Sequence, residues 1–505
     1  MYLIGCQIRF SDRKGYSEGV TQFETYLIIV ALLLIASVLS SKVASRFGIP
    51  ALLIFLMIGV FSGGHVLDIV SFKSYSITQN LGVVALILIL FSGGMNTEVK
   101  LSRPVLKAAL TLSTLGVMIS ALAVGLFSKY FLNFSLLEGL LLGATVVSTD
   151  VAAVFTILRS KKVSLKMGIA PLLELESALN DPMAVFLGIT LLDLIQNPEH
   201  SLWNLIPLFF EQMIFGLVFG YGLGWLAVLL INKIRLEFEG LYPVLSLSWI
   251  VFAYAITQHF GGSGFLAVYI IGILVGNKKV LHQKSLSHFH EGAAWLGQIT
   301  MFLAMGVLID PESLWRVAPA GIVLSLFLVF IARPVSVFLC FPITNFTVPE
   351  KLMISWAGLR GAVPIILGSY VLVSQIPKAK EIFNLVFFVT FLSVLLQGTT
   401  VPLIAKWLKV NLPFREKFKF PIEFSPTQDL RSKLIEIQVQ KRSSACGKSL
   451  VQLNLPRNSL IVLIEREGEV LVPRGDTYLY EKDSLLVLSE NIEAEKIRAL
   501  FSTPS

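Results

Sequence analysis

The chain has few charged residues and few cysteines, and both shortages narrow its class. Only 15% of its 505 residues are Asp, Glu, Lys or Arg, whereas soluble domains carry about a quarter. The three cysteines, Cys6, Cys340 and Cys446, are too far apart in the chain to form a metal-binding or redox motif. The low charge content excludes an ordinary soluble globular protein, and we expect the cysteines to be inert thiols.

Two further sequence signals are missing. No small-residue cleavage site follows the first hydrophobic stretch, so we expect this stretch to be retained as a helix. A strand followed by GxGxxG is also absent, because the nearest glycine string, GYGLG at 220–224, lies inside a hydrophobic segment. There it indicates close packing of helices. A complete nucleotide-binding Rossmann domain is therefore not expected.

Long hydrophobic runs dominate what is present. The chain is 55% hydrophobic and its mean hydropathy is +0.76. Apolar runs of about 18 or more residues are candidate membrane-spanning helices. We predict a mostly α, polytopic membrane protein with about 13 transmembrane helices. The thirteen segments are 23–41, 48–64, 78–95, 104–127, 136–158, 167–195, 205–232, 242–259, 262–276, 292–309, 316–341, 351–374 and 381–407.

Basic residues gather in alternate loops, which sets the expected orientation. Loops such as 159–166 and 278–284 are rich in lysine and arginine, and the loops between them are poor. Because cytoplasmic loops carry the basic excess, we expect the N-terminus outside and the C-terminal tail in the cytoplasm. The net charge of +8 then reflects these loops and does not indicate nucleic-acid binding.

Composition changes at residue 408 and predicts a second domain. We expect an N-terminal tail at 1–22, a transmembrane domain at 23–407, a charged linker at 408–432 and a small α+β cytoplasmic domain at 433–505. Short apolar runs (LIEIQV, SLIVLIER, EVLVP and SLLVLS) predict strands, and IEAEKIRALF predicts a closing helix. A domain of roughly 70 residues has a modest core, so we expect it to dimerise.

Four acidic side chains lie in segments that otherwise read as lipid-spanning: Asp150, Glu174, Glu176 and Asp181. A carboxylate in hydrocarbon is costly and usually lines an ion or proton path. Asp150 and Asp181 are near the middles of consecutive segments, so the fold can bring them together at mid-membrane. The alternative is a buried structural hydrogen bond between helices.

Two arginines, Arg333 and Arg360, also lie in apolar surroundings. A membrane-buried charge needs a partner, and we predict a structural ion pair between Glu176 and Arg333. Residues that tolerate a helix break surround Asp150 and Arg360, in VVSTD and GLRGAVP. Ion transporters use broken helices at their binding sites, where a carboxylate stabilises a positive helix end and a guanidinium a negative one. Snorkelling of Arg360 to the interface is the alternative.

Five motifs now resemble a known family. They occur in the order TDVAAVF, ESALNDP, GGSGFLAVYIIGILVGN, IARPVSV and WAGLRGAVP. In this order and spacing they resemble the monovalent cation:proton antiporters of the CPA superfamily, in the NhaP/Na⁺–H⁺ exchanger branch, over about residues 23–407. The resemblance implies an NhaA-like fold with inverted repeats and crossed discontinuous helices. The segments that hold Asp150 and Arg360 are the fifth and the twelfth, seven apart, which is consistent with such repeats.

The tail, which reads GKSLVQLNLPRNSLIVLIEREGEVLVPRGDTYLYEKDSLLVLS over residues 447–489, resembles the C-terminal RCK (TrkA-C) domain. Together the two parts look like the potassium/proton antiporters of the cell-volume-regulation type. This resemblance implies a transporter and not an enzyme, forming a homodimer in the bacterial inner membrane. It implies exchange of K⁺, or of Na⁺, for H⁺, and a Na⁺(Li⁺)/H⁺ antiporter is the alternative.

The resemblance also implies roles for individual residues. Asp181 is the expected alternating acceptor of cation and proton, with Asn180 beside it. Ser177 and Thr149 would offer oxygen atoms to the ion, and Asp150 would lie at the crossing of the unwound helices. The family's buried ion pair corresponds to Glu176 and Arg333, and its GLRG arginine to Arg360.

One departure from the family pattern concerns the third helix. Relatives often carry an acidic residue where this chain reads LFSGGMNTE. Ser92, Gly94 and Asn96 therefore leave that extra ligand in doubt. We expect the nearest acid, Glu98, to lie at the helix end.

A single shared acid suffices for the expected mechanism. Burial disfavours the charged form of a carboxyl group, so the group holds either a proton or a cation. Asn180 in place of a second Asp predicts electroneutral exchange. An intramembrane aspartyl protease also needs two acids on adjacent helices, but the usual GxGD context is missing. A cation channel would need a filter such as TVGYG, and no such run occurs.

We expect no resident cofactor and no metal beyond the transported cation. A regulatory nucleotide, such as a cyclic dinucleotide, is a candidate ligand of the C-terminal domain, where Lys441, Arg442 and Arg474 would attract an anion. Membrane lipids are expected partners of the basic linker. The loop with His282, His288 and His290 is expected to be solvated and pH-responsive, with a metal site as the alternative.

Overall fold

The computed structural model of the chain divides into two compact units, Met1–Pro413 and Phe414–Ser505, and each is described by itself. In the first unit the structure describes residues 22–47, 50–63, 75–166, 168–201, 203, 205–340 and 346–413. In the second it describes 432–440, 443, 445–453, 455–456, 459–466, 469–490, 497 and 500–501. Most of the predicted linker, Lys441, Arg442, and the N-terminal tail up to residue 21 therefore lie outside the described residues.

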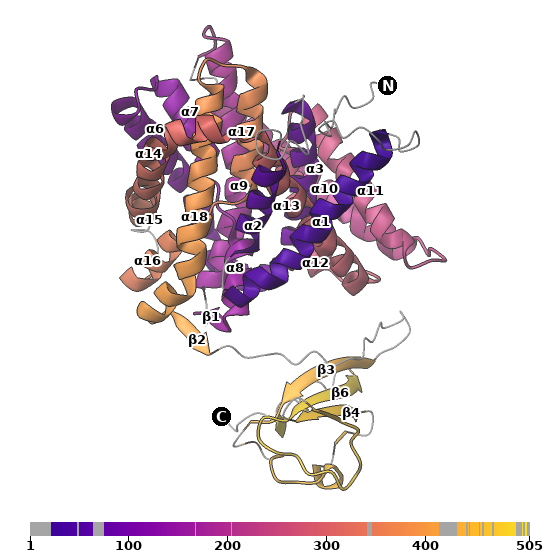
Figure 1. Ribbon diagram of the computed structural model, residues 1–505. Helices are drawn as coiled ribbons and strands as arrows, with labels where there is room; N and C mark the ends of the chain where they lie inside the picture. The colour runs from indigo at the N-terminus through magenta and orange to yellow at the C-terminus, as the bar shows by residue number, and fades with distance from the viewer. Residues whose placement is uncertain are drawn as a thin grey trace, which may run out of the picture. The chain divides into compact units, whose positions relative to one another are not determined.

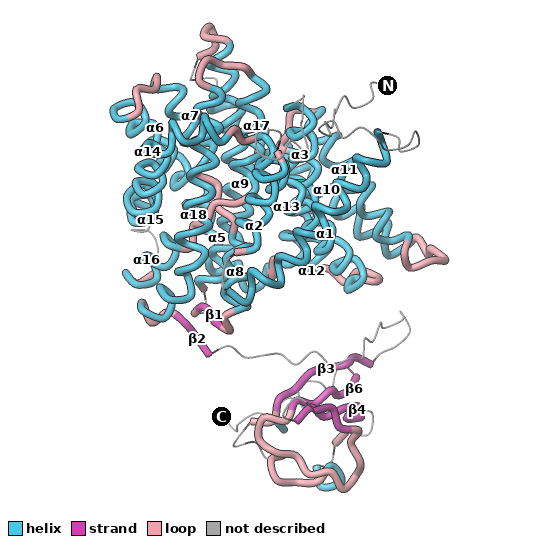
Figure 2. The backbone as a smooth tube through the Cα atoms, viewed as in Figure 1, coloured by secondary structure: helices cyan, strands magenta, loops and turns pink. Residues whose placement is uncertain are grey.

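The first unit is a bundle of helices (Figures 1 and 2). Its first half contains α1 (Gln22–Phe47), α2 (Ala51–Ser62), α3 (Tyr75–Asn96), α4 (Val99–Ser102), η1 (Arg103–Val105), α5 (Leu106–Thr111), η2 (Leu112–Gly116), α6 (Val117–Phe131), α7 (Leu136–Val146), α8 (Val151–Ser160) and α9 (Ile169–Gln196). Its second half contains α10 (Leu205–Lys233), α11 (Leu241–His259), α12 (Gly264–Asn277), α13 (Gln283–Leu308), α14 (Pro311–Phe327), η4 (Leu328–Ala332), α15 (Arg333–Cys340), α16 (Val348–Trp356), α17 (Ala362–Ser374) and α18 (Ala379–Trp407).

Within the described ranges, nine helices are long and apolar enough to cross a membrane. Four shorter apolar helices accompany them, at Leu27–Lys42, Ala51–Ser62, Gly264–Asn277 and Ala362–Ser374. These lengths and compositions define a polytopic helical membrane protein. Its buried apolar side chains form one continuous core through the bundle.

Several segments that the sequence presents as single runs are interrupted. The run at 136–160 breaks between α7 and α8, and the run at 348–374 breaks between α16 and α17. The runs at 99–131 and 311–340 each contain one five-residue π-helical turn, η2 and η4. Such turns shift the side chains that follow around the helix axis, and they are frequent near functional sites.

Glycines allow the closest helix contacts. In α10, Gly216, Gly220 and Gly224 follow at four-residue spacing, and a Cβ on each would lie within 3.2 Å of an α12 atom or of the Ser263 carbonyl that precedes α12. A Cβ on Gly272 of α12 would lie 3.1 Å from the Cα of Gly94 in α3. Small residues let membrane helices approach closely and gain van der Waals contact. The string at 220–224 is thus a packing motif, as its position predicts.

The second unit contains a four-stranded antiparallel sheet in the order β3-β6-β4-β5 (Figure 1). The strands are β3 (Ser432–Gln438), β4 (Ser459–Arg466), β5 (Glu469–Leu471) and β6 (Ser484–Glu490), with one 3₁₀ turn, η6 (Leu450–Leu453). They fall on the four apolar runs of the sequence. Side chains from the strands, together with Ile497 and Phe501, form a small core. Most of the predicted closing helix lies outside the described residues.

A two-stranded antiparallel ribbon belongs to the first unit. It pairs β1 (Val163–Leu165) with β2 (Asn411–Pro413), in the register Val163↔Pro413 and Leu165↔Asn411. The sequence assigns residues 411–413 to the linker, whereas they are paired strand here. A three-residue strand has no periodicity of its own to detect, and its partner is almost 250 residues away in the chain.

The close contact between α3 and α12 gives a stability prediction. We expect Gly272→Ala to lower stability by about 1–3 kcal/mol, because the new methyl group must enter an already packed contact. Gly222→Ala in α10 is the matched control, since a Cβ at that position meets nothing within 4 Å. The melting temperatures of the purified variants in detergent test this difference. Equal melting temperatures would show that the two helices separate at no cost.

Candidate functional site

The two helix breaks meet in the middle of the bundle. The chain between α7 and α8 and the chain between α16 and α17 are both non-helical, and the Asp150 backbone N–H donates to the Leu359 carbonyl at 2.6 Å. At each break the ends of two half-helices leave backbone donors and acceptors without helical partners. Such groups need polar partners in a buried setting, and the charged side chains nearby supply them.

Asp150 and Arg360 lie at helix ends of opposite polarity. The Asp150 carboxylate caps α8 by accepting a hydrogen bond from the Ala153 N–H at 3.1 Å. The Arg360 Nη1 donates to the Val147 carbonyl and to the Ser148 carbonyl, the latter at 3.1 Å, beyond the end of α7. The negative group thus meets a positive helix end and the positive group a negative one. Arg360 does not snorkel out of the bundle, because the residue is only 1% exposed.

Asp181 lies on α9, against the first break. Its Oδ1 accepts a hydrogen bond from the Ser148 hydroxyl. The residue is 8% exposed, so it is enclosed by protein. Pro182 follows inside the helix and has no N–H, which leaves the Ala178 carbonyl without its usual helical donor. The Ser148 hydroxyl and this carbonyl therefore lie on the two elements that meet at Asp181.

A set of polar groups joins α9 to the first break. The Asn180 Nδ2 donates to the Thr149 Oγ1 at 2.7 Å and to the Glu176 Oε1 at 3.1 Å. The Ser177 hydroxyl donates to the Thr149 carbonyl at 2.7 Å and accepts from the Val151 N–H at 3.3 Å. These bonds fix the orientation of Asn180 and Ser177 beside Asp181.

Glu176 and Arg333 form an ion pair inside the bundle. The Arg333 Nη2 lies 3.0 Å from the Glu176 Oε2, and both side chains are at most 3% exposed. Arg333 is the first residue after the π-helical turn η4. A Cβ on Gly358 would lie 3.0 Å from the Arg333 Nε, so the second break passes close against the guanidinium. This pair is the partnership that the sequence predicts.

Two polar residues of the site, Ser393 and Gln397, did not stand out in the sequence, and Ser148 stood out only as a residue that tolerates a helix break. Ser148 binds Asp181. In α18 the Ser393 hydroxyl accepts from the Arg360 N–H at 3.0 Å, and the Gln397 Nε2 donates to the Trp356 carbonyl at 2.9 Å, so both hold the second break. Burial of a hydroxyl or amide group costs little free energy when the group is hydrogen-bonded. The sequence signal is therefore weak: Ser393 and Gln397 are a polar pair four residues apart in an apolar helix.

The remaining predicted acids lie at the edge of this site or outside it. Helix α3 contains no acidic residue, and Glu98 is exposed at the N-terminal cap of α4. Ser92 is buried and Asn96 is exposed. Glu174 is half-buried on α9, two turns before Asp181. The position where relatives carry an acid on the third helix therefore has no carboxylate here.

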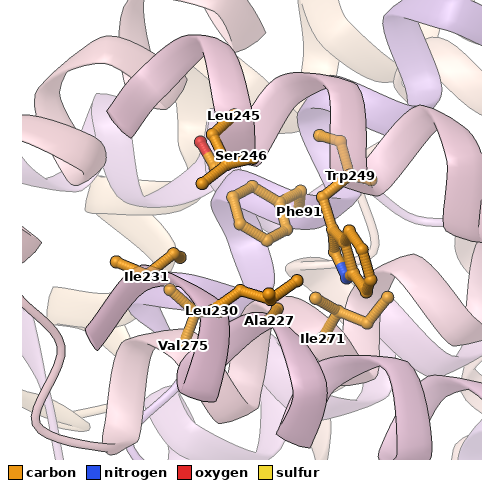
Figure 3. Close-up of a pocket in the computed structure, with 10 residues that line it drawn as sticks. Phe91, Ala227, Leu230, Ile231, Leu245, Ser246, Trp249, Ile271 and Val275 are labelled. Carbon is orange, nitrogen blue, oxygen red and sulfur yellow. The ribbon is translucent and has the colours of Figure 1, made fainter. Parts of the chain in front are cut away.

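A pocket elsewhere in the bundle does not suit an ion. It lies between α3, α10, α11 and α12 and is lined by apolar side chains such as Phe91 and Ile271 (Figure 3). Its polar groups already have partners: the Ser246 hydroxyl binds His290 at 2.7 Å, and the Trp249 Nε1 donates to the Leu223 carbonyl at 3.0 Å. This pocket is a packing defect and not a second cation site.

The histidine-rich segment differs from the expected solvated loop. Residues 283–308 form α13, and His290 is fully buried on it, hydrogen-bonded to Ser246. His288 is exposed on the same helix, and His282 precedes its first turn. The polar stretch that contains His288 and His290 belongs to the same helix as the apolar residues after it, and the helix begins at Gln283. In the part of the chain that the structure describes, no cluster of three or more His, Cys, Asp or Glu residues suits a metal ion.

Broken helices that meet inside a polytopic bundle, with Asp150 at a helix end and the buried Asp181 on the helix beside it, are the architecture of an ion-coupled secondary transporter. Comparison with known proteins identifies the family. The family model for the sodium/hydrogen exchanger transmembrane domain matches residues 29–407, and the TrkA-C domain model matches residues 434–502. The chain belongs to the sodium/hydrogen exchanger family, a family of membrane antiporters, and carries a C-terminal TrkA-C domain.

Individual relatives agree with this assignment. The chain is 35% identical over 481 residues to the K⁺/H⁺ antiporter NhaP of Alkalimonas amylolytica, covering 94% of this chain and 83% of the relative. It is 38% identical over 484 residues to the K⁺/H⁺ antiporter NhaP2 of Shewanella sp. (strain ANA-3), covering 95% and 83%. Its fold is similar to the solved sodium proton antiporter MjNhaP1 of Methanocaldococcus jannaschii, with a TM-score of 0.64 and 25% identity over 75% of this chain and 100% of that one.

The buried ion pair gives a second stability prediction. We expect Glu176→Leu or Arg333→Leu alone to destabilise the protein by about 3–5 kcal/mol, because each leaves an unpaired buried charge. The double variant should lose much less than the sum. Asp193→Ala is the control. Asp193 lies on the same helix as Glu176, but its ion pair with His200 is exposed, so its loss should change stability little. Thermal unfolding in detergent measures all four, and additive losses would contradict a direct interaction.

Proposed function

We propose that the protein exchanges K⁺ for H⁺ across the membrane, and that Asp181 binds the two ions alternately. One observation carries this proposal: the charges gathered at the helix breaks do not balance. The site contains three carboxylates, Asp150, Glu176 and Asp181, and two guanidinium groups, Arg333 and Arg360. Three negative and two positive charges leave one negative charge, which one proton or one monovalent cation neutralises.

Asp181 is the group at which neutralisation occurs on this proposal. Glu176 is already paired with Arg333, and Asp150 caps α8. In the described structure, Asp181 has a neutral hydroxyl as its hydrogen-bond partner. A buried carboxylate is unfavourable unless it is protonated or bound to a cation, so the two ions compete for it.

The neighbouring oxygen atoms supply the rest of the cation's coordination. We assign this role to the hydroxyls of Ser148 and Thr149 and to Ser177, whose hydroxyl is close to the first break. Hard monovalent cations prefer oxygen ligands. Asn180 is neutral, so it orients the site without adding a second exchangeable charge. One exchangeable charge makes the exchange electroneutral, with one H⁺ moving for each K⁺.

We further infer that the bundle has thirteen transmembrane helices built from inverted repeats with NhaA-like crossed helices. The support is a repeated pattern of irregularities: a π-helical turn in one segment and a broken helix in the next, at 112–116 and 147–150 and again at 328–332 and 357–361. Rocking of one repeat against the other around the site would expose Asp181 to each side of the membrane in turn.

K⁺ is the proposed cation because relatives named as K⁺/H⁺ antiporters match the chain along nearly its whole length, TrkA-C region included. Exchange of Na⁺ or Li⁺ is the second candidate. It is favoured by the similarity of the helical unit to a sodium proton antiporter. Both cations would bind the same oxygen atoms, so the site described here serves either assignment.

The division into domains and the cellular setting complete the proposal. Residues 23–407 form the transport domain, 408–432 a linker and 433–505 a regulatory domain, whose ligand we propose to be a nucleotide such as a cyclic dinucleotide. The protein acts as a homodimer in the bacterial inner membrane, surrounded by lipid. Its N-terminus is outside and its C-terminal domain is in the cytoplasm, in agreement with the basic loops.

Substitution of Asp181 tests the central role. We expect Asp181→Asn to abolish exchange while the protein stays folded, because the amide keeps the shape of the carboxylate but has no charge to neutralise. Asp193→Asn is the matched control: it lies on the same helix, is well exposed, and should leave exchange unchanged. Everted vesicles loaded with a pH-sensitive dye measure the response to added K⁺, Na⁺ and Li⁺.

Each outcome of that cation series has a definite meaning. Exchange of any of the three cations by Asp181→Asn would remove the assigned role from Asp181. A response of the unaltered protein to Na⁺ and Li⁺ but not to K⁺ would replace K⁺ by the second candidate.

The charge count predicts independence from membrane voltage. We expect an imposed potential to drive no proton movement in proteoliposomes that have equal K⁺ and equal pH on both sides, because the loaded site is neutral with either ion. A gradient of a permeant lipophilic anion sets the potential without moving K⁺, and a dye in the lumen reports pH. A pH change larger than in protein-free liposomes would contradict electroneutral exchange.

A further inference from the structure

The ribbon of β1 and β2 joins the connection between α8 and α9 to the segment that follows α18. Strand β1 lies in the short connection between α8 and α9. The first of these helices is capped by Asp150, and the second carries Asp181. Strand β2 follows α18 and contains the last described residues before the chain continues into the C-terminal unit. The two sides of the ribbon therefore lead to the transport site and to the second unit.

The ribbon is firmly held on its transport side. Val163 and Leu165 are at most 8% exposed, and Val410, just before β2, is 1% exposed. The Lys166 N–H donates to the Val410 carbonyl at 2.9 Å, which extends the pairing by one bond. Strand β1 also packs against α8. A displacement of β2 is thus passed to β1 by backbone hydrogen bonds, and from β1 to α8 by packing.

Both strands leave their helices through a sharp reversal. Lys162 precedes β1 and has a φ of 53°, and Lys409 precedes β2 and has a φ of 55°. Residues other than glycine rarely adopt this left-handed conformation. Two such reversals at the root of one ribbon fix the direction in which each strand leaves its helix.

The path from the ribbon to the site is short and rigid. Helix α8 has only ten residues, and it runs from Asp150 to the turn before β1. Helix α18 touches the same region, since a Cβ on Gly398 would lie 3.4 Å from Ile157 of α8 and 3.5 Å from Leu359. Leu359 accepts the hydrogen bond of the Asp150 N–H. Helix α8 therefore connects the helix break at its N-terminus to the ribbon at its C-terminus.

We propose that the β1–β2 ribbon transmits the state of the C-terminal unit to Asp150 and Asp181, by moving α8 and the start of α9. The inference rests on the proposed function, because it concerns regulation of the same exchange site. The C-terminal unit acts through its covalent connection at Pro413, and the paired strands convert a pull on β2 into a displacement of α8.

The register identifies a substitution that breaks the ribbon. The bond from Lys166 to Val410 follows the pair Leu165↔Asn411. By the alternation of an antiparallel ladder, Ser164 and Leu412 are then the pair that exchanges two backbone hydrogen bonds. Leu412→Pro removes the N–H of this pair. Leu412→Ala removes nearly the same side chain, which is 40% exposed, and keeps the N–H, so it is the matched control.

A change in the C-terminal unit provides the signal. Asp483 is 1% exposed and accepts from the Arg466 Nε at 3.0 Å and from the Tyr480 N–H at 2.8 Å. Asp483→Asn disturbs this buried network of the second unit and changes no residue of the first. The test determines the K⁺ concentration that gives half-maximal exchange in everted vesicles. It compares the protein with and without Asp483→Asn in the unaltered, Leu412→Ala and Leu412→Pro backgrounds.

We expect Asp483→Asn to shift the half-maximal K⁺ concentration at least threefold in the first two backgrounds and less than 1.5-fold with Leu412→Pro. If the two sites were independent, Asp483→Asn would shift the half-maximal K⁺ concentration equally in every background. A shift that disappears with Leu412→Pro therefore shows that Asp483 and the ribbon are coupled. An equal shift in all three backgrounds would overturn the proposal, and so would the absence of a shift in the unaltered background. Absence of K⁺ exchange in the unaltered protein would instead count against the proposed function.

A cross-link covers the case in which Leu412→Pro fails to fold. Ser164→Cys with Leu412→Cys, in a chain whose three native cysteines are replaced, places two thiols on opposite strands of the ribbon. With the disulfide formed, exchange and its response to Asp483→Asn should persist, because the strands move as one body. Loss of the response on oxidation, with recovery on reduction, would show that the strands must separate and would refute the ribbon as a transmitter.

Discussion

The structure depends on the stabilisation of two helix breaks inside a membrane bundle. Each break leaves backbone groups without helical partners in the interior of the bundle, and a fixed charge of the matching sign lies at the exposed end. Asp150 caps the beginning of α8, and Arg360 binds the carbonyls that follow α7. Without these two side chains the non-helical backbone beside Asp181 would be too costly to keep. The candidate site is thus a consequence of how the breaks are satisfied.

The sequence reveals the charged part of this site well. Asp150, Asp181 and the pair Glu176–Arg333 stand out because a charge in an apolar segment is expensive and therefore informative. The structure places all of them around the two breaks. The break near Asp150 is also visible beforehand, because it follows a serine and a threonine.

The neutral part of the site and the ribbon are hidden from such reasoning. Ser393 and Gln397 are hydroxyl and amide groups of a kind that many membrane helices carry, so nothing in the sequence separates a structural one from an ordinary one. Ser148 indicates the helix break, but its bond to Asp181 is not visible in the sequence. The pairing of β1 with β2 joins segments far apart in the chain, and neither strand is long enough to show an alternating pattern. The histidines misled for a related reason, since polar residues at the start of α13 resemble a loop until the helical spacing of the residues after them is counted.

The uneven number of opposite charges around Asp181 has a consequence for energy conservation in the cell. If the vacant site retains an uncompensated negative charge, its passage between the two faces of the membrane is the least favourable step of the cycle. Only a loaded carrier then reorients readily. On the proposed mechanism, this imbalance itself suppresses slippage, in which one ion gradient is dissipated without building the other.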